Sequence, residues 1–198
     1  MTPKTFILIG RSGSGKGTQA KLLREALASK ETEGRNIYYV ETGARFREFI
    51  QGESYSSSLA AEINKIGARQ PDFLAVWNWA HYLVHDMTGE EHLMFDGTPR
   101  SYGEAVIIDG ALKFYKREKP IVVYLNVSRE WSRKHLLARG RMDDKTEDEV
   151  DRRLNWFDTD VMPAVEYFKK HPEYQFVDVH GEQSIEEVHQ EIIKAVNL

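Results

Sequence analysis

A glycine-rich segment near the start of the chain limits the possible folds more than any other feature. It reads Gly10-Arg-Ser-Gly-Ser-Gly-Lys-Gly-Thr-Gln19, directly after the apolar run Thr5–Ile9 and before a helical pattern. Its glycines can adopt positive φ and turn successive backbone N–H groups toward an anion. The following helix points its N-terminal partial charge at the same place, and Lys16 adds a full positive charge. The segment therefore predicts a strand, a phosphate-binding loop and a helix.

This loop differs by one position from the strict P-loop pattern. G-x-x-x-x-G-K-[ST] requires Ser or Thr directly after the lysine, whereas Gly17 follows here and Thr18 comes next. The glycine spacing disfavours a dinucleotide-binding turn, because the lysine would stand where the helix must pack. The residues expected to hold the phosphates of a nucleoside triphosphate are Gly13, Ser14, Gly15, Lys16, Gly17 and Thr18.

Short apolar runs alternate with helical patterns along most of the chain. The runs predicted as strands are Thr5–Ile9, Ile37–Glu41, His92–Phe95, Ile121–Asn126 and Tyr174–Val179. They are nearly continuous in apolar residues, as expected for strands that helices cover on both faces. We therefore predict an α/β fold, a P-loop three-layer sandwich whose five-stranded parallel sheet is flanked by helices, with residues 1–198 forming one domain.

Two segments depart from simple alternation. Residues 42–86 hold two or three helices between the second and third strands, more than one crossover requires, and are predicted to form an inserted helical lobe. Residues 138–146 form a short charged loop between two helices. Thr146, with Glu149 three residues later, resembles a capping box and predicts that a helix begins there.

Composition excludes several classes of protein. The 198 residues include 27 Lys and Arg against 31 Asp and Glu, a net charge of −4, which argues against coating nucleic acid or a membrane through bulk charge. There is no cysteine, so a disulfide framework, a thiolate zinc site and a cysteine nucleophile are excluded. No run approaches the roughly 20 apolar residues of a membrane helix. We expect a cytoplasmic protein without nucleic-acid or membrane partners.

Two further motifs follow predicted strands. Thr42-Gly43-x-x-x-Arg47 follows the second strand, and Asp96-Gly97-Thr98-Pro99-Arg100 follows the third. Because the carboxyl ends of neighbouring parallel strands form one ligand-binding crevice, both should converge with Lys16. A carboxylate such as Asp96 suits magnesium, directly or through water. Arginines suit phosphate, since the guanidinium group donates two parallel hydrogen bonds.

These motifs together resemble the adenylate kinase (nucleoside monophosphate kinase) family in its short-lid form. They occur in the family's order, and the fourth motif is Gly140-Arg141-x-Asp143-Asp144 followed by Arg153-Leu154. The resemblance implies transfer of the γ-phosphoryl group of ATP to AMP with Mg²⁺, giving two ADP. It also implies that residues 42–86 bind the monophosphate and that residues 138–146 are a short lid without zinc. We expect a monomer whose partners are nucleotides.

The resemblance also assigns roles to individual residues. The catalytic set is Lys16, Arg100, Arg139, Arg141 and Arg153. The triphosphate site is the loop from Gly13 to Thr18, with Arg139. The monophosphate site is Thr42, Gly43, Arg47, Gln70, Gly97, Thr98, Pro99, Arg100, Glu104, Arg141 and Arg153. Asp96 is expected to hold magnesium through water.

Two neighbouring arginines compete for the last motif position. Arg152 and Arg153 are both candidates, because the count from Asp144 is ambiguous by one residue. The helix predicted to begin at Thr146 is a firmer reference, since extra residues in the preceding loop do not change the phase inside the helix. Two helical turns after Thr146 lies Arg153, on the face of the cap. The phase therefore favours Arg153.

Position 104 bears on the acceptor base. Adenylate-specific members of the family have a glutamine facing adenine four residues after the third motif's arginine, and here Glu104 stands in that place. An ionised carboxylate only accepts hydrogen bonds, so it would suit guanine or the amino group of cytosine better than N1 of adenine. A protonated carboxyl, a one-residue shift or a bridging water would preserve adenine, and Glu104 could also simply start its helix. AMP is the expected acceptor, with CMP, UMP or GMP as the alternative.

Other readings remain open at this point. A small-metabolite kinase is disfavoured, because the second and third motifs suit an acceptor that already carries a phosphate. An ATP-binding regulatory module without transfer could lack the lid and transfer-site arginines, which this chain has. His81 and His85 lie four residues apart on a predicted helix, but no third ligand is evident, so we expect packing or exposure rather than metal binding.

Overall fold

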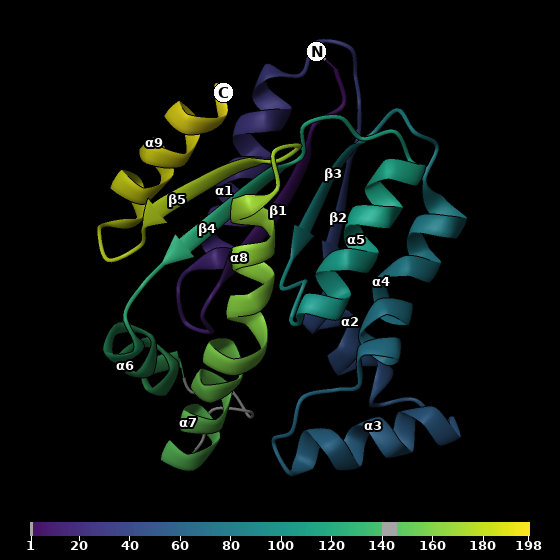
Figure 1. Ribbon diagram of the computed structural model, residues 1–198, viewed down its shortest axis with the longest axis vertical. Coiled ribbons are helices and arrows are strands. Elements are labelled where there is room, and N and C mark those ends of the chain that lie inside the picture. Colours follow the sequence, from purple (N-terminus) through teal and green to yellow (C-terminus); the bar gives the residue numbers. More distant parts are fainter. Residues whose placement is uncertain (1, 140–145) are drawn as a thin grey trace.

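The computed structural model describes residues 2–139 and 146–198, in which strands and helices alternate as the sequence predicts (Figure 1). Among the described helices, none is long and apolar enough to cross a membrane. In chain order the elements are β1 (Thr5–Gly10), α1 (Lys16–Lys30), β2 (Ile37–Glu41), α2 (Thr42–Phe49), α3 (Tyr55–Lys65), α4 (Asp72–Asp86), β3 (His92–Asp96), α5 (Tyr102–Phe114), β4 (Ile121–Asn126), α6 (Arg129–Arg139), α7 (Glu147–Trp156), the π-helical turn η1 (Phe157–Val161), α8 (Met162–Lys170), β5 (Gln175–His180) and α9 (Ile185–Val196).

The five strands form one sheet in the order β2-β3-β1-β4-β5, and every neighbouring pair is parallel. The predicted five-stranded parallel sheet is confirmed, with strand ends displaced by at most one residue. The strands β2, β3 and β1 are neighbours and run parallel, so their carboxyl ends lie side by side at one end of the sheet. The three motifs begin at or directly after the last residues of these strands, Gly10, Glu41 and Asp96, and so start at neighbouring positions.

Side chains of the central strand divide the core into two layers. Ile7 and Ile9 pack into the layer beneath α4, α5 and α8, whereas Phe6 and Leu8 pack into the layer beneath α1 and α9. All four are at most 2% exposed. This division follows from the two-residue period of a strand and explains why the strand sequence is apolar without alternation. The helices thus cover both faces of the sheet (Figure 1).

The two segments that depart from alternation differ in form. Between β2 and β3 the chain builds three helices, and α3 lies at the end of this segment farthest from the sheet (Figure 1). Farther along the chain, α7 begins after Thr146, whose hydroxyl accepts from the backbone of Glu149 while the Glu149 side chain accepts from Thr146. The predicted capping box is confirmed. Most of the expected lid, residues 140–145, lies outside the described residues.

Candidate functional site

The phosphate loop connects β1 to α1. Gly13 and Gly15 adopt φ of 84° and 89°, values that favour glycine, and α1 begins at the next residue, Lys16. The ammonium group of Lys16 folds back over the loop and donates to the carbonyl oxygens of Gly10 at 2.6 Å and Arg11 at 2.8 Å. The loop thus presents a helix N-terminus and a lysine side by side, as an anion-binding site requires.

Close packing fixes the position of this loop. A Cβ atom at Gly13 would lie 2.8 Å from the carbonyl oxygen of Ser132 and 3.1 Å from Cγ of Leu136, so only glycine lets the loop approach α6. Ser14 is 6% exposed, and its buried hydroxyl has no hydrogen-bond partner among the described residues. A phosphate oxygen in the loop would satisfy this hydroxyl.

Arg11 anchors the loop from its other side, a role that the sequence did not indicate. Its guanidinium group lies 4.5 Å from the ring centroid of Phe157 and 2.6 Å from a carboxylate oxygen of Asp158, and it donates to the carbonyl oxygen of Val127 at 3.2 Å. Phe157 and Asp158 belong to η1, the turn after α7. Arg11 therefore ties the phosphate loop to the helix that carries Arg153.

The carboxylate of Asp96 lies beside the first turn of α1. A Cβ atom at Gly17 would be 3.8 Å from Oδ2 of Asp96. The hydroxyl of Tyr39 donates to the same oxygen at 2.8 Å. Burial, and then the charge of Asp96, raise the pKa of Tyr39 well above its usual value, so the phenol stays protonated and remains a donor. The sequence did not indicate Tyr39; in the sheet it pairs with Met94, which makes Asp96 a diagonal neighbour.

The second and third motifs meet around the guanidinium group of Arg100. Thr42 donates through its hydroxyl to the carbonyl oxygen of Gly97 at 2.9 Å, and Nε of Arg100 donates to the same oxygen at 2.7 Å. Cβ atoms at Gly43 and Gly97 would lie 3.6 and 3.4 Å from Nη2 of Arg100. Gly43 also leaves room for Arg47, whose Nη1 would be 3.3 Å away. Two glycines therefore bring two arginines together.

A cleft joins this turn to the phosphate loop and α7. Its polar lining includes Lys16, Arg69, Arg100 and Arg153. Arg153 donates to the hydroxyl of Ser12 in the phosphate loop at 3.4 Å. Arg152 instead lies against the turn after α3. A Cβ atom built at Gly67 in that turn would be 3.1 Å from Nε of Arg152. The helical phase that favoured Arg153 thus agrees with the position of its side chain.

Positive charge dominates this part of the cleft. Burial lowers the pKa of Arg100, and the neighbouring guanidinium groups of Arg153 and Arg47 act in the same direction, while Glu104 and Asp96 oppose it. An arginine nevertheless stays charged at any physiological pH. The lowered pKa therefore reflects mainly the burial of this guanidinium group, and a bound anion would stabilise its charge.

Glu104 differs from the sequence-based expectation that it faces the acceptor base. The residue is 1% exposed. Its Oε1 accepts from Nε1 of Trp79 at 3.0 Å and from the hydroxyl of Thr98, and its Oε2 accepts from the backbone N–H of Arg100. Burial raises the pKa of Glu104, although these hydrogen bonds and the charge of Arg100 oppose the shift. The carboxyl group supports the Thr98–Arg100 turn, whose Thr98–Pro99 peptide is cis, and does not face the cleft.

Gln70, a predicted residue of the monophosphate site, lies in the turn between α3 and α4. Its Nε2 donates to the carbonyl oxygen of Ala60 at 2.8 Å, and its buried Oε1 has no partner among the described residues. The neighbouring Arg69 lines the cleft and bonds to Asp72 and, at 3.1 Å, to Asp160 near the end of η1. The sequence did not indicate a phosphate role for Arg69.

The comparisons with known proteins bear on this arrangement. A family model described as adenylate kinase matches residues 8–173, the span that contains all four motifs. The chain belongs to the adenylate kinase family. Its relatives include the adenylate kinase of Flavobacterium psychrophilum, 27% identical over 97% of both chains, and adenylate kinase 1 of a Nostoc species, 28% identical over 94% of this chain and 95% of the relative. The adenylate kinase of Leuconostoc mesenteroides is 29% identical over 84% of both chains.

Membership of the adenylate kinase family makes this chain a kinase that transfers phosphoryl groups between ATP and AMP. Two arginines expected from the family pattern are not among the described residues that line this cleft. Arg139 is the last residue of α6, and Arg141 lies outside the described residues. Thr18 lies in the exposed first turn of α1, directly after the lysine and glycine of the loop.

Proposed function

We propose that this chain transfers the γ-phosphoryl group of ATP to AMP as a monomer, using the residues of the cleft described above. One observation carries the proposal: Lys16, Arg100 and Arg153 come from three separate elements and line the same cleft. In the transfer, a phosphate oxygen of AMP bonds to the γ-phosphorus as the bond to the bridging oxygen of ATP breaks, and two ADP form. Cations arranged around the transferred group supply most of such catalysis.

The phosphate loop would bind ATP. Backbone N–H groups between Gly13 and Thr18 would cradle the phosphates, and Lys16 would exchange its present carbonyl partners for phosphate oxygens. The buried hydroxyl of Ser14, which has no partner among the described residues, supports this assignment. Arg139, at the end of α6, and Arg141 would contribute from the lid, residues 138–146.

The helical segment of residues 42–86 and the turn after β3 would bind AMP. Arg47 and Arg100 would hold its phosphate, with Gly43 and Gly97 leaving room for both guanidinium groups. Arg153 would sit between the two phosphate sites, since it lines the cleft beside Lys16 and contacts Ser12. Pro99 also lines the cleft, and Thr42, Thr98 and Gln70 would support its walls.

Asp96 fits a magnesium ion held through water. Its carboxylate is buried beside the first turn of α1, and Tyr39 engages Oδ2 while no hydrogen bond from a described residue reaches Oδ1. Oxygen ligands of this kind suit Mg²⁺, which usually keeps several waters. When bound, the ion would offset negative charge on the ATP phosphates. Asp96 would orient its water, and Tyr39 would hold the carboxylate in place. With no cysteine in the chain, a thiolate zinc site is excluded.

The position of Glu104 supports AMP as the acceptor. The alternative of CMP, UMP or GMP depended on a carboxylate at the base, and this carboxyl group instead bonds to Trp79, Thr98 and Arg100. Base contacts would then come from the turn between α3 and α4, in which Arg69 lines the cleft and Gln70 follows it.

A panel of AMP, CMP, UMP and GMP with magnesium–ATP, followed by ADP formation, tests the proposal. We expect a strong preference for AMP, and loss of transfer in Lys16→Ala and Arg100→Ala. Arg153→Ala and Arg152→Ala form a matched pair, in which only the first should abolish transfer. ATP binding without turnover of any acceptor would make the chain a regulatory module, and a preference for another base would refute AMP as the acceptor.

A further inference from the structure

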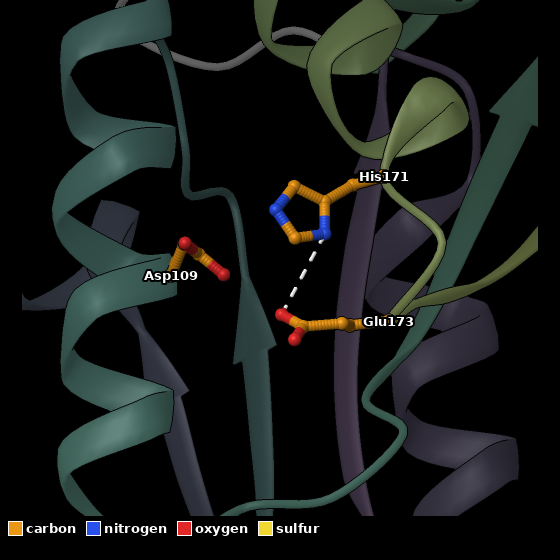
Figure 2. A group of neighbouring side chains, drawn as sticks. All are labelled: Asp109, His171 and Glu173. Atoms are coloured by element: carbon orange, nitrogen blue, oxygen red, sulfur yellow. Dashed lines mark ion pairs between the residues drawn. The ribbon is translucent and has the colours of Figure 1, made fainter.

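Three metal-ligating side chains gather on the face of the sheet covered by α5 and α8. They are Asp109 in the middle of α5 and, between α8 and β5, His171 and Glu173. One ligand atom from each lies within 4.8 Å of the others, and Figure 2 shows the carboxylate of Asp109 directed toward the pair formed by His171 and Glu173. Glu173 lies just before the amino end of β5, whereas the phosphate loop follows the carboxyl end of β1. The cluster therefore lies toward the opposite end of the parallel strands from the phosphate loop. The phosphoryl transfer proposed above does not use it.

His171 is the member of the cluster whose ring nitrogen lacks a hydrogen-bond partner among the described residues. This nitrogen, Nδ1, is buried. Oε2 of Glu173 lies 3.9 Å away, within ion-pair distance of a protonated imidazole (Figure 2) but too far for a hydrogen bond. The ring packs against Tyr167 and Tyr174, each with its centroid 5.3 Å away, so the imidazole is held in this orientation. A buried ring nitrogen without a partner is costly, and a metal ion would satisfy it.

Asp109 is held as a ligand-competent carboxylate. Tyr174 donates to its Oδ1 at 2.9 Å, and Tyr167 donates to its Oδ2 at 3.1 Å. Burial opposes ionisation of Asp109, but the hydrogen bonds from Lys113, Tyr174 and Tyr167 outweigh it and lower the pKa. Two tyrosine hydroxyls thus orient the carboxylate in the way that outer-shell partners orient metal ligands.

The cluster already attracts a cation from its own chain. The ammonium group of Lys113 lies 3.0 Å from Oδ2 of Asp109 and 3.2 Å from Oε2 of Glu173. Lys113 is 54% exposed, so its side chain can leave without disturbing the core. An ammonium group offers only donors, and no hydrogen bond joins it to Nδ1 of His171. A metal ion between the three side chains would replace the charge of the lysine and also satisfy the imidazole.

We propose that Asp109, His171 and Glu173 bind a divalent transition-metal ion, with Zn²⁺ as the representative, and that the ion displaces the ammonium group of Lys113. One imidazole nitrogen and two carboxylate oxygens suit Zn²⁺ and its neighbours in the first transition series, whereas Mg²⁺ prefers oxygen alone. Three protein ligands leave a position for water. The ion would connect α5 to the segment between α8 and β5.

Titration of the untagged, nucleotide-free protein with Co²⁺ followed by visible absorption, and with Zn²⁺ followed by calorimetry, tests the site. We expect one ion per chain, competition between the two metals, and affinity lowered about 10-fold or more in His171→Ala and Glu173→Gln. Lys113→Met should raise the affinity, because the resident cation is gone. All of these substitutions are at partly or fully exposed positions, and far-ultraviolet circular dichroism checks that each variant is folded.

The pair His81 and His85 provides the matched control. These histidines lie on α4 with ring centroids 6.3 Å apart and could capture a metal ion nonspecifically. The double variant His81→Ala/His85→Ala should keep the binding if the cluster at Asp109 is the site. Binding that disappears in this control and persists in His171→Ala would overturn the proposal. So would the absence of saturable binding in both the natural chain and Lys113→Met.

Discussion

Replacement of Glu104 by glutamine tests whether this side chain supports the turn after β3 or reads the acceptor base. Two N–H donors approach different oxygens of the carboxyl group: Nε1 of Trp79 bonds to Oε1, and the backbone N–H of Arg100 bonds to Oε2. An amide has a single oxygen, so either orientation of a glutamine turns its NH₂ group toward one of these N–H groups. Thr98 cannot relieve this conflict, since its hydroxyl contacts Oε1 alone.

The expected cost follows from this geometry. Leaving one buried donor unsatisfied costs about 1–3 kcal/mol of unfolding free energy. For a domain of this size each kcal/mol corresponds to roughly 2–4 °C in Tm. The Tm of Glu104→Gln should therefore fall by about 2–12 °C. Glu62→Gln, at an exposed glutamate on α3, is the control and should change little.

The stability contributed by Glu104 should decrease as the pH rises. Because the pKa of Glu104 is raised in the folded protein, the stability that its protonated form contributes is fully present below the pKa of an unfolded glutamic acid. That contribution is lost as the pH rises through the higher folded pKa. The amide has no such titration. The stability difference between the natural chain and Glu104→Gln should therefore be largest at about pH 4 or below, where an unfolded glutamic acid is protonated, and should narrow as the pH rises in thermal unfolding experiments.

Two outcomes would refute this reasoning. A Glu104→Gln variant as stable as the natural chain at about pH 4, or a stability difference that widens as the pH rises, would show that the carboxyl group does not hold the turn. A change of acceptor preference among AMP, CMP, UMP and GMP in this variant, at unchanged stability, would place residue 104 at the base. We expect the preference for AMP to remain.

Three further predictions concern the cleft and its supports. Tyr39→Phe removes the hydrogen bond to Asp96 and should raise the Mg²⁺ concentration for half-maximal activity up to about 10-fold, whereas the exposed Tyr55→Phe should not. Gly97→Ala, at φ 83° with a Cβ 3.1 Å from Oγ1 of Thr42, should raise the KM for AMP more than that for ATP; equal changes in steady-state kinetics would contradict the assignment. Thr146→Ala removes the cap of α7 and should lower unfolding free energy by about 1 kcal/mol, while Thr146→Ser should keep it in chemical denaturation.

Local patterns were sufficient to predict much of the site. A glycine-rich turn after an apolar strand has few alternatives, so the phosphate loop and the start of α1 followed from residues adjacent in sequence. The preference for Arg153 over Arg152 used the same kind of rule, because a capping box fixes where a helix begins and the helical period fixes which side chain returns to the cap's face. In each case a backbone rule acts over less than about ten residues.

The sequence could not predict contacts that depend on a third segment. The direction of Glu104 depends on Trp79, which comes from α4 and brings an indole N–H beneath the turn. Tyr39 reaches Asp96 because β2 and β3 pair in one register, and a shift by one residue would turn the phenol to the other face. Neither contact leaves a trace in the residues next to these positions.

The sequence by itself determined the parallel sheet, the phosphate loop and the order of the motifs, since each depends on short-range periodicity and on glycine and lysine at fixed spacing. Only the tertiary structure decided which polar groups meet. In the folded chain, Glu104 is buried under the turn after β3 and the hydroxyl of Tyr39 donates to Asp96. His171 lies beside Asp109, away from the phosphate loop. The physical reason is that side-chain partners are chosen by packing between distant elements, and packing does not appear as a local pattern.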